Sequence, residues 1–212
     1  MKLGFIGSGP VSQVLGKAYA ERGHEVMLSS RDISKLAAWS EEAGKNAHVG
    51  TFAEAAAFGE IIFLSVRNDV VFDAIGMAGG GSLSGKTVVD LTNPMDFSGG
   101  MPPKFTAEVG GSLGERIQRA LPDSDVVKAF NTIGIAVMTD PMFDGQAATH
   151  FIAGNSETAK SAVADLISEF GWDVVDVGGI EQSFYLEALA MLWVNYALKE
   201  GSWSQAFKLL RR

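Results

Sequence analysis

Two glycines near the N-terminus follow a short apolar run at a spacing that suits binding of a pyrophosphate. The run Lys2–Ile6 leads into Gly7–Val11, and Ser12 takes the third small-residue position of a G-x-G-x-x-G pattern. The glycines permit a tight turn and a close approach of the backbone to phosphate, and a helix from Pro10 would point free N–H groups at that anion. The pattern predicts a dinucleotide-binding turn at Gly7, Ser8, Gly9, Pro10 and Val11.

A second group of side chains, Ser30, Arg31 and Lys35, follows the next apolar run. In a Rossmann unit, an Asp or Glu at this place binds the ribose 2′-hydroxyl of NAD. A hydroxyl and a guanidinium instead suit a 2′-phosphate, which a carboxylate would repel. A helix that begins at Asp32 would place Lys35 one turn beyond Arg31. The group favours NADP(H) over an ordinary charged helix start, although Asp32 could reach a ribose hydroxyl and allow NAD.

The elements that must position these residues alternate between strand and helix. Such alternation predicts βαβ units, and the short apolar runs fit strands that are covered on both faces. The expected fold is α/β, a Rossmann-type doubly wound and mainly parallel sheet with C-terminal helices. We expect an NADP-binding domain at residues 1–180 and a helical extension at 181–212. The expected strands are Lys2–Ile6, Glu25–Leu28, His48–Thr51, Ile61–Val66, Thr87–Leu91, Val126–Phe130, Thr149–Ala153 and Asp173–Val177. The expected helices lie near Val11–Arg22, Ile33–Ala43, Phe52–Phe58, Val70–Met77, Leu113–Leu121, Glu157–Phe170, Glu181–Glu200 and Trp203–Leu210.

Polar residues follow three of these strands at their carboxyl ends, where open α/β sheets bind ligands. They would line the path of the nicotinamide ribose and the substrate, although Asn, Thr and Pro also serve ordinary turns. Asn131 and Thr132 are expected to orient the carboxamide or the acceptor. The expected cofactor-binding residues here are Ser65, Val66, Asn93, Pro94, Ala129, Asn131 and Thr132.

Composition excludes other classes of site. The chain has 212 residues, no cysteine and a net charge of −8. It therefore has no disulfide or thiolate chemistry, and no general basic surface for nucleic acid or an anionic membrane. The first apolar run is too short for a signal peptide, and no stretch approaches the length of a membrane helix. The absence of cysteine is compatible with a reducing cytoplasm, and a cytoplasmic location is expected. The three histidines have no partner at metal or catalytic spacing. We expect no metal site and no catalytic side chain.

Two further segments need an interpretation. Gly80–Thr87 matches G-x-x-x-x-G-K-[ST], but a phosphate-binding loop needs a strand before it and a helix after it. Here the expected order is reversed, which argues against nucleotide hydrolysis. Residues 98–112 are rich in Gly and Pro and are either a lid or substrate loop or a flexible connection. A helix should begin after Ser112, which has capping-box spacing to Glu115.

The whole chain resembles the F420-dependent NADP reductase family, which is related to the cytoplasmic domain of STEAP metalloreductases and more distantly to pyrroline-5-carboxylate reductase. The resemblance rests on the glycine turn, Gly23–Val26, the Ser30 cluster, Val126–Ile133 and Leu186–Leu189. It implies NADP(H) bound by Ser8–Val11, Ser30, Arg31, Lys35, Ser65, Val66, Asn93 and Ala129. It also implies hydride transfer between nicotinamide and the deazaflavin of coenzyme F420, within a homodimer.

Three hypotheses follow. The first is an NADP(H)-dependent oxidoreductase that exchanges a hydride with F420, a flavin or a related planar acceptor, because no acid–base pair stands out and ring positioning would then carry the catalysis. The second is an NADPH-dependent imine or ketone reductase on the same scaffold. The third is a non-catalytic NADP(H) sensor.

Overall fold

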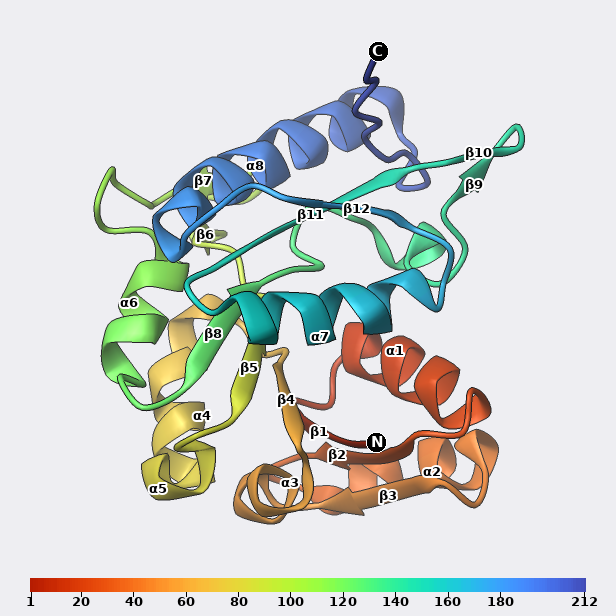
Figure 1. Cartoon of the computed structure of the whole chain (residues 1–212), viewed down its shortest axis with the longest axis vertical. Coiled ribbons are helices and arrows are strands. Elements are labelled where there is room, and N and C mark those ends of the chain that lie inside the picture. The colour runs from red at the N-terminus through yellow and green to blue at the C-terminus, as the bar shows by residue number, and fades with distance from the viewer. The chain divides into compact units, whose positions relative to one another are not determined.

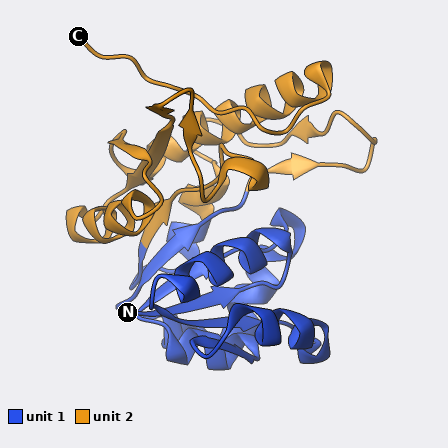
Figure 2. Ribbon diagram, turned by 90° about the vertical axis from the view of Figure 1, so that its right-hand side faces the viewer, with its two compact units in different colours: residues 1–92, 117–125 blue, residues 93–116, 126–212 orange.

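The computed structural model describes residues 1–212 and contains two compact units, coloured separately in Figure 2. Unit 1 comprises residues 1–92 and 117–125, and unit 2 comprises residues 93–116 and 126–212. The predicted division into residues 1–180 and 181–212 stays a prediction. No helix in the structure is both long enough and apolar enough to span a membrane.

Unit 1 contains a parallel sheet with strand order β3-β2-β1-β4-β5 (Figure 1). All four residues of β4 are buried, as the apolar run predicts for a strand covered on both faces. This order and the helices between the strands confirm the predicted α/β, Rossmann-type fold. The strands are β1 (Lys2–Ile6), β2 (Glu25–Ser29), β3 (Ala47–Gly50), β4 (Ile61–Leu64) and β5 (Thr87–Asp90).

The core of unit 1 depends on close packing between sheet and helix. Phe5 of β1 stacks on Phe63 of β4 with ring centroids 4.4 Å apart. Gly4 lies so near the helix after β3 that a Cβ would stand 2.2 Å from the carbonyl oxygen of Ala55, so only glycine fits there. The helices of unit 1 are α1 (Pro10–Glu21), α2 (Ala37–Ala43), α3 (Phe52–Phe58), α4 (Val71–Ala78) and α5 (Gly80–Leu83), with 3₁₀ helices η1 (Ile33–Leu36) and η2 (Asn68–Val70).

Unit 2 pairs its strands in the order β8-β11-β12. Strand β11 runs antiparallel to β8 and parallel to β12, so the sheet is mainly rather than wholly parallel. Helices α7 and α8 lie on opposite sides of β11 and β12 in Figure 1. The strands are β8 (Asp125–Lys128), β11 (Thr149–Gly154) and β12 (Asp173–Asp176), with hairpins β6 (Met95–Asp96)–β7 (Lys104–Phe105) and β9 (Met142–Phe143)–β10 (Gln146–Ala147). The helices are α7 (Glu157–Ser168), α8 (Ser183–Glu200), η3 (Ile135–Val137) and η4 (Ile180–Gln182), and α6 (Leu113–Ala120) begins in this unit.

Two predicted helices were wrong in detail. The helix expected over Ile33–Ala43 is divided into η1 and α2, with Asp32 capping η1. The helix expected over Trp203–Leu210 does not form. Gly201 ends α8 in a left-handed conformation. The backbone of the tail then forms long-range hydrogen bonds, and the Phe207 carbonyl accepts the N–H of Thr149 at 2.8 Å.

Candidate functional site

The glycine turn joins β1 to α1 in unit 1 and fixes the backbone at the end of the sheet. Gly7 has φ of +138°, and a Cβ there would lie 2.1 Å from the carbonyl oxygen of Ser65. Only glycine combines that dihedral angle with such a close approach. Ser65 itself follows β4 and donates its N–H to the Ile6 carbonyl at 3.0 Å. The predicted residues Gly7 and Ser65 therefore lie side by side at the carboxyl ends of neighbouring strands.

The N-terminus of α1 has the features of an anion site. Gly9 caps the helix without any side-chain hydrogen bond, Pro10 follows it, and the first turn contains no acidic residue. A Cβ on Gly9 would meet no atom within 4 Å, so open space lies beside the free N–H groups. Gln13 steadies the turn by donating its side-chain amide to the Ser8 carbonyl at 2.9 Å. A phosphate at this point would be stabilised by the N–H groups and by the helix dipole.

After β2, Arg31 has no hydrogen-bond or ion-pair partner, whereas the carboxylate of the neighbouring Asp32 already accepts hydrogen bonds. Asp32 accepts hydrogen bonds from the Ser34 backbone at 3.2 Å and from its hydroxyl at 2.6 Å. The Ser34 hydroxyl bond is the main reason that the pKa of Asp32 lies below its usual value, and Lys35 adds to it. Arg31 is exposed and forms no hydrogen bond or ion pair. Both bonds fall on Oδ1 of Asp32, so Oδ2 can still accept a ribose hydroxyl, and the NAD alternative stays open.

Lys35 is not placed as the sequence suggested. A regular helix from Asp32 would have put Arg31 and Lys35 one turn apart on the same face. Because Asp32 is the cap of a short 3₁₀ helix, Arg31 precedes the helix and Lys35 lies within it. Ser30, also predicted, is buried and accepts the N–H of Asp32 on its hydroxyl at 3.1 Å. The prediction that these three residues share one site stays a prediction.

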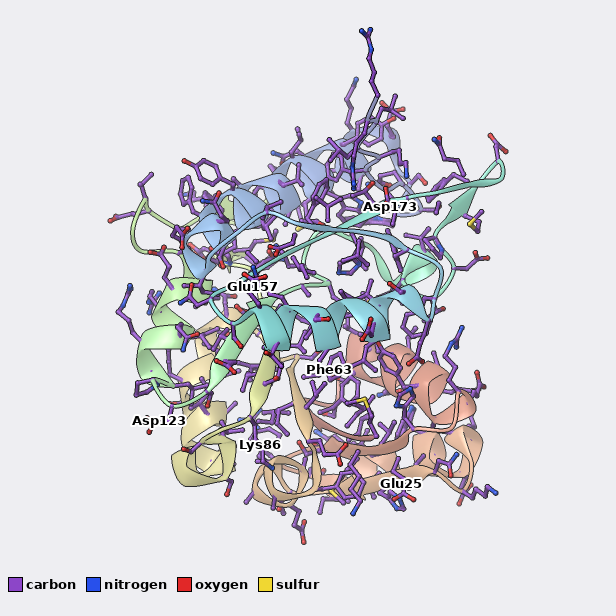
Figure 3. The ribbon with its side chains drawn as sticks, in the orientation of Figure 1. Glu25, Phe63, Lys86, Asp123, Glu157 and Asp173 are labelled. Carbon is purple, nitrogen blue, oxygen red and sulfur yellow. The ribbon has the colours of Figure 1, made fainter.

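Lys86 does not have the role that the G-x-x-x-x-G-K-[ST] pattern at Gly80–Thr87 would give it. Its ammonium group donates to the carbonyls of Ala56 at 2.6 Å and Gly59 at 2.7 Å, at the C-terminal end of α3. Burial lowers the pKa of Lys86. Helix α4 precedes the pattern, α5 forms its first four residues, and β5 begins at its last residue, Thr87. The side chain, labelled in Figure 3, caps a helix and is not placed to hold a nucleotide phosphate.

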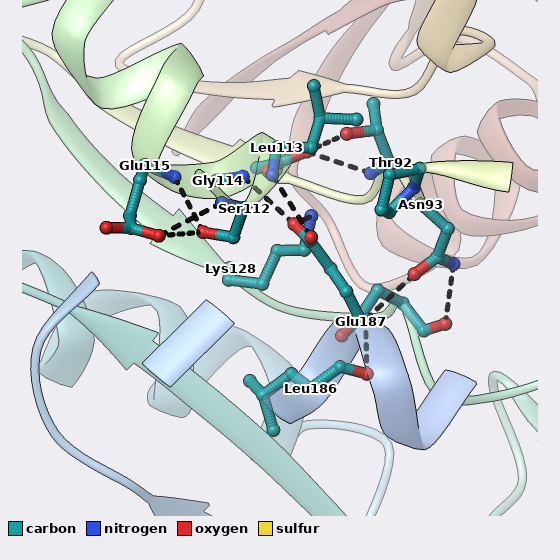
Figure 4. Close-up of polar contacts among 12 residues, drawn as sticks. Thr92, Asn93, Ser112, Leu113, Gly114, Glu115, Lys128, Leu186 and Glu187 are labelled. Atoms are coloured by element: carbon teal, nitrogen blue, oxygen red, sulfur yellow. Dashed lines mark hydrogen bonds and ion pairs between the residues drawn. The ribbon is translucent and has the colours of Figure 1, made fainter. Parts of the chain in front are cut away.

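In unit 2, two predicted asparagines bind each other. The Asn93 side-chain amide donates to the Asn131 carbonyl at 2.8 Å, and that of Asn131 donates to Asn93 Oδ1 at 3.0 Å (Figure 4). Asn131 Nδ2 also donates to the Leu186 carbonyl of α8 at 3.0 Å. Asn131 Oδ1 is buried and has no partner. The cluster thus holds one amide oxygen as an unsatisfied acceptor, which costs about 1–3 kcal/mol unless something binds there.

The remaining residues predicted in these loops, Val66, Pro94, Ala129 and Thr132, differ in environment. Val66 is half-buried, whereas Ala129 and Thr132 are buried. Pro94 accepts the N–H and the hydroxyl of Thr106 on its carbonyl, both at 2.9 Å. These contacts give the loops a defined backbone.

A strained residue lies inside the loop after β8. Phe130 has φ of +60°, an uncommon value for an aromatic residue. Its N–H is accepted by Nε2 of His150 at 2.8 Å. Complete burial lowers the pKa of His150 to about 3, so the ring is neutral and carries its proton on Nδ1. His150 is therefore structural, as expected, and holds the loop that presents Ala129 and Asn131.

Sequence reasoning missed a buried ion pair in unit 2. Lys128 Nζ lies 2.8 Å from Glu187 Oε1, and neither side chain is exposed. The signal was present, because each charged residue interrupts an apolar strand or helix. No group of three His, Cys, Asp or Glu is arranged to hold a metal ion. A pocket of about 340 Å³ lies along α8 and the tail, lined by Leu192, Trp193, Tyr196, Gln205, Ala206 and Phe207.

Comparisons with known proteins indicate an NADP-dependent oxidoreductase. The family model described as NADP oxidoreductase, coenzyme F420-dependent, matches residues 2–94. A crystal structure from Arthrobacter sp. FB24, described provisionally as an F420-dependent NADP-reductase, is 35% identical with a TM-score of 0.93, and the match covers 100% of each chain. The F420-dependent NADP reductase of Methanocaldococcus jannaschii is 28% identical over 89% of this chain and 83% of its own. Metalloreductase STEAP3 of Rattus norvegicus is 27% identical over 90% of this chain but only 36% of its own.

Proposed function

Since this chain belongs to the family of coenzyme F420-dependent NADP oxidoreductases, we propose that it transfers a hydride between the nicotinamide of NADP(H) and a planar acceptor, coenzyme F420 or a related flavin. It is an NADP-dependent oxidoreductase. The observation that carries the choice of NADP(H) is the unpaired, exposed Arg31 beside the capped Asp32. A free guanidinium binds a 2′-phosphate without first losing an internal partner.

The residues proposed to bind NADP(H) fall into two groups, each within one unit. In unit 1, the free N–H groups of α1 beside Gly9 bind the pyrophosphate, and Ser30, Arg31 and Lys35 bind the 2′-phosphate. The loop at Ser65 and Val66 lies beside the glycine turn and lines the same end of the sheet. The bound nicotinamide supplies the hydride chemistry.

In unit 2, the loops at Asn93–Pro94 and Ala129–Thr132 are proposed to orient the nicotinamide carboxamide. The Asn93–Asn131 cluster offers neutral amide groups, which suit a neutral carboxamide better than a charged side chain would. No side chain has to move a proton during this transfer, because the acceptor takes the electron pair into a conjugated ring.

The acceptor is tested by stopped-flow oxidation of NADPH against F420, FMN, FAD, ferric chelates and a panel of imines and ketones. Rapid reduction of F420 or a flavin supports the proposal. Turnover restricted to imines or ketones would replace it with the second hypothesis. Tight NADPH binding without turnover on any acceptor would replace it with the sensor hypothesis. The Arg31→Ala variant at subsaturating NADPH shows whether the observed oxidation belongs to this site.

We also propose that the chain forms a homodimer through the outer face of α8. Tyr185, Leu192 and Tyr196 are 63%, 58% and 51% exposed there, although all three carry large apolar groups, and half-buried Leu189 lies between them. A row of this kind on one helix face is typical of a subunit contact. Sedimentation equilibrium tests it: the wild type should be a dimer and Leu192→Lys a monomer, whereas a monomeric wild type would refute the proposal.

Charge and composition support the proposals on the remaining partners and on the location. The net charge of −8 supports the proposal that neither nucleic acid nor an anionic membrane is a partner. The absence of cysteine fits the proposed cytoplasmic location.

A further inference from the structure

Glu187 of α8 sits at the centre of a buried polar cluster in unit 2. Its Oε1 lies 2.8 Å from Lys128 Nζ and accepts the N–H of Gly114 at 2.9 Å, while its Oε2 accepts the N–H of Leu113 at 3.0 Å (Figure 4). One carboxylate thus joins strand β8, the first turn of α6 and helix α8. Both charged side chains are fully buried.

Stability alone is a poor reason for this arrangement. Removing two charges from water costs several kcal/mol per ion, and a well-packed apolar pair at such a place is often as stable or more stable. What the carboxylate adds is geometry, because three donors from two different elements fix its position. Helix α8 is therefore held in one register against the end of β8.

The residue next to Glu187 connects this register to the proposed site. The carbonyl of Leu186 accepts one hydrogen of Asn131 Nδ2, and Asn93 Oδ1 accepts the other. With both amide hydrogens engaged, the orientation of the Asn131 side chain is settled and its Oδ1 is the acceptor left over. A shift of α8 by a fraction of a turn would release one of these bonds and allow the amide to rotate.

We propose that Glu187, paired with Lys128, is a positioning residue: it holds α8 so that Asn131 presents a fixed amide oxygen to the carboxamide of the nicotinamide. The inference rests on the proposed function. Glu187 touches neither substrate nor cofactor and acts only through Leu186 and Asn131. Its loss should therefore loosen the nicotinamide without removing any group proposed to bind the phosphates.

The expected signature separates binding from chemistry. In Glu187→Gln, the Kd of NADPH should stay within about threefold of the wild type, because none of the charge-assisted bonds proposed for the phosphates involves Glu187. The hydride-transfer rate should fall about tenfold or more, because a misplaced ring loses the aligned geometry that transfer needs. The KM for NADPH should change little while kcat falls.

The main readout does not depend on any acceptor. Binding that immobilises the nicotinamide raises the fluorescence yield and lifetime of NADPH, so titration of the protein into NADPH reports ring order directly. Glu187→Gln should bind NADPH yet lose most of this enhancement. Asn131→Ala should lose it to a similar degree, and the double variant should lose little more, because both residues act on one step.

A control variant separates positioning from general stability. Lys160→Met breaks the nearly buried contacts of Lys160 with Asp176 at 2.6 Å and Glu157 at 2.7 Å, on another face of the same unit. It should lower the melting temperature and leave the fluorescence enhancement and kcat unchanged. If Glu187→Gln does not fold, the double variant Lys128→Met/Glu187→Leu restores apolar packing without the carboxylate and takes its place.

The outcomes are distinguishable. The proposal is overturned if the Glu187 variant keeps the enhancement and kcat, if its NADPH affinity falls as much as its kcat, or if Lys160→Met shows the same losses. It is also overturned if wild-type protein leaves the fluorescence of bound NADPH unchanged. If the wild type reduces no acceptor, the proposed function fails, but the fluorescence titration still decides the role of Glu187.

Discussion

Replacing Arg31 with alanine should weaken NADPH binding strongly and leave NADH binding almost unchanged. In the structure the guanidinium is exposed, has no internal partner and follows directly after the buried Ser30. Its removal therefore breaks no contact within the protein, and the free energy of unfolding should change by less than about 0.5 kcal/mol. Any large effect must then arise in the complex.

The size of the loss follows from the kind of bond. A hydrogen bond to a charged group contributes about 1.5–3 kcal/mol, and a guanidinium on a phosphate belongs to this class. Each 1.4 kcal/mol corresponds to a factor of ten in Kd, so NADPH should bind roughly 10- to 150-fold more weakly. Lys35 lies in the adjacent 3₁₀ helix, and because it is also proposed to bind the 2′-phosphate, its remaining charge favours the lower half of that range.

The assay is isothermal titration of wild-type and variant protein with NADPH and NADH at fixed ionic strength. The matched control is Arg119→Ala, which removes one exposed arginine from α6 in the same unit. It should leave both affinities within about twofold, since Arg119 is not among the residues proposed to bind the dinucleotide and an exposed charge is screened by salt. Equal affinity of the wild type for the two dinucleotides, or an equal loss for both in Arg31→Ala, would refute the assignment of Arg31 to the 2′-phosphate.

Two further predictions concern the glycine turn and His150. Gly9→Ala should weaken NADPH binding but leave the free energy of unfolding within about 0.5 kcal/mol, since its Cβ meets no atom within 4 Å. Gly7→Ala should lower the free energy of unfolding by about 3 kcal/mol, because its Cβ would lie too close to the Ser65 carbonyl. Chemical denaturation and NADPH titration compare the two variants, and equal stability of both would contradict the reasoning. His150 has a folded-state pKa of about 3 against 6.5 when unfolded, so the unfolded chain binds more protons below pH 6.5 and stability should fall as the pH drops from there toward about 3. His150→Gln should flatten this slope by up to about 1.4 kcal/mol per pH unit in urea denaturation at several pH values, and an unchanged slope would show that other groups cause it.

Local patterns in the sequence predicted the local structure well. The glycine turn was predictable because a strand, a backbone with positive φ and a helix start all have short-range signals. The capping box of α6 is likewise local: the Glu115 N–H reaches the Ser112 hydroxyl at 3.2 Å, and Glu115 Oε2 accepts that hydroxyl at 2.6 Å. In each case the residues that decide the structure lie within a few positions of one another.

The predictions failed where contacts between residues far apart in the sequence determine the structure. The tail after Gly201 carries apolar residues at helical spacing, yet its backbone binds Thr149, and the Trp193 indole donates to the Gln205 carbonyl at 2.9 Å. Those bonds replace the ones a helix would have made within itself. The Lys128–Glu187 pair was missed for a similar reason, because no short-range sequence pattern identifies which buried cation pairs with which buried anion.

The two units, each taken by itself, differ in the chemistry that their predicted site residues offer. Unit 1 presents cations and free backbone N–H groups, which are what anionic phosphates require. Unit 2 presents neutral amides in a buried cluster, which suit an uncharged carboxamide, because an unpaired buried charge would cost far more than an amide. Phosphate recognition can be read from a sequence because its residues are nearly contiguous. The amide cluster joins positions 38 and 55 residues apart, so its orientation depends on the register of α8, and through it on Glu187.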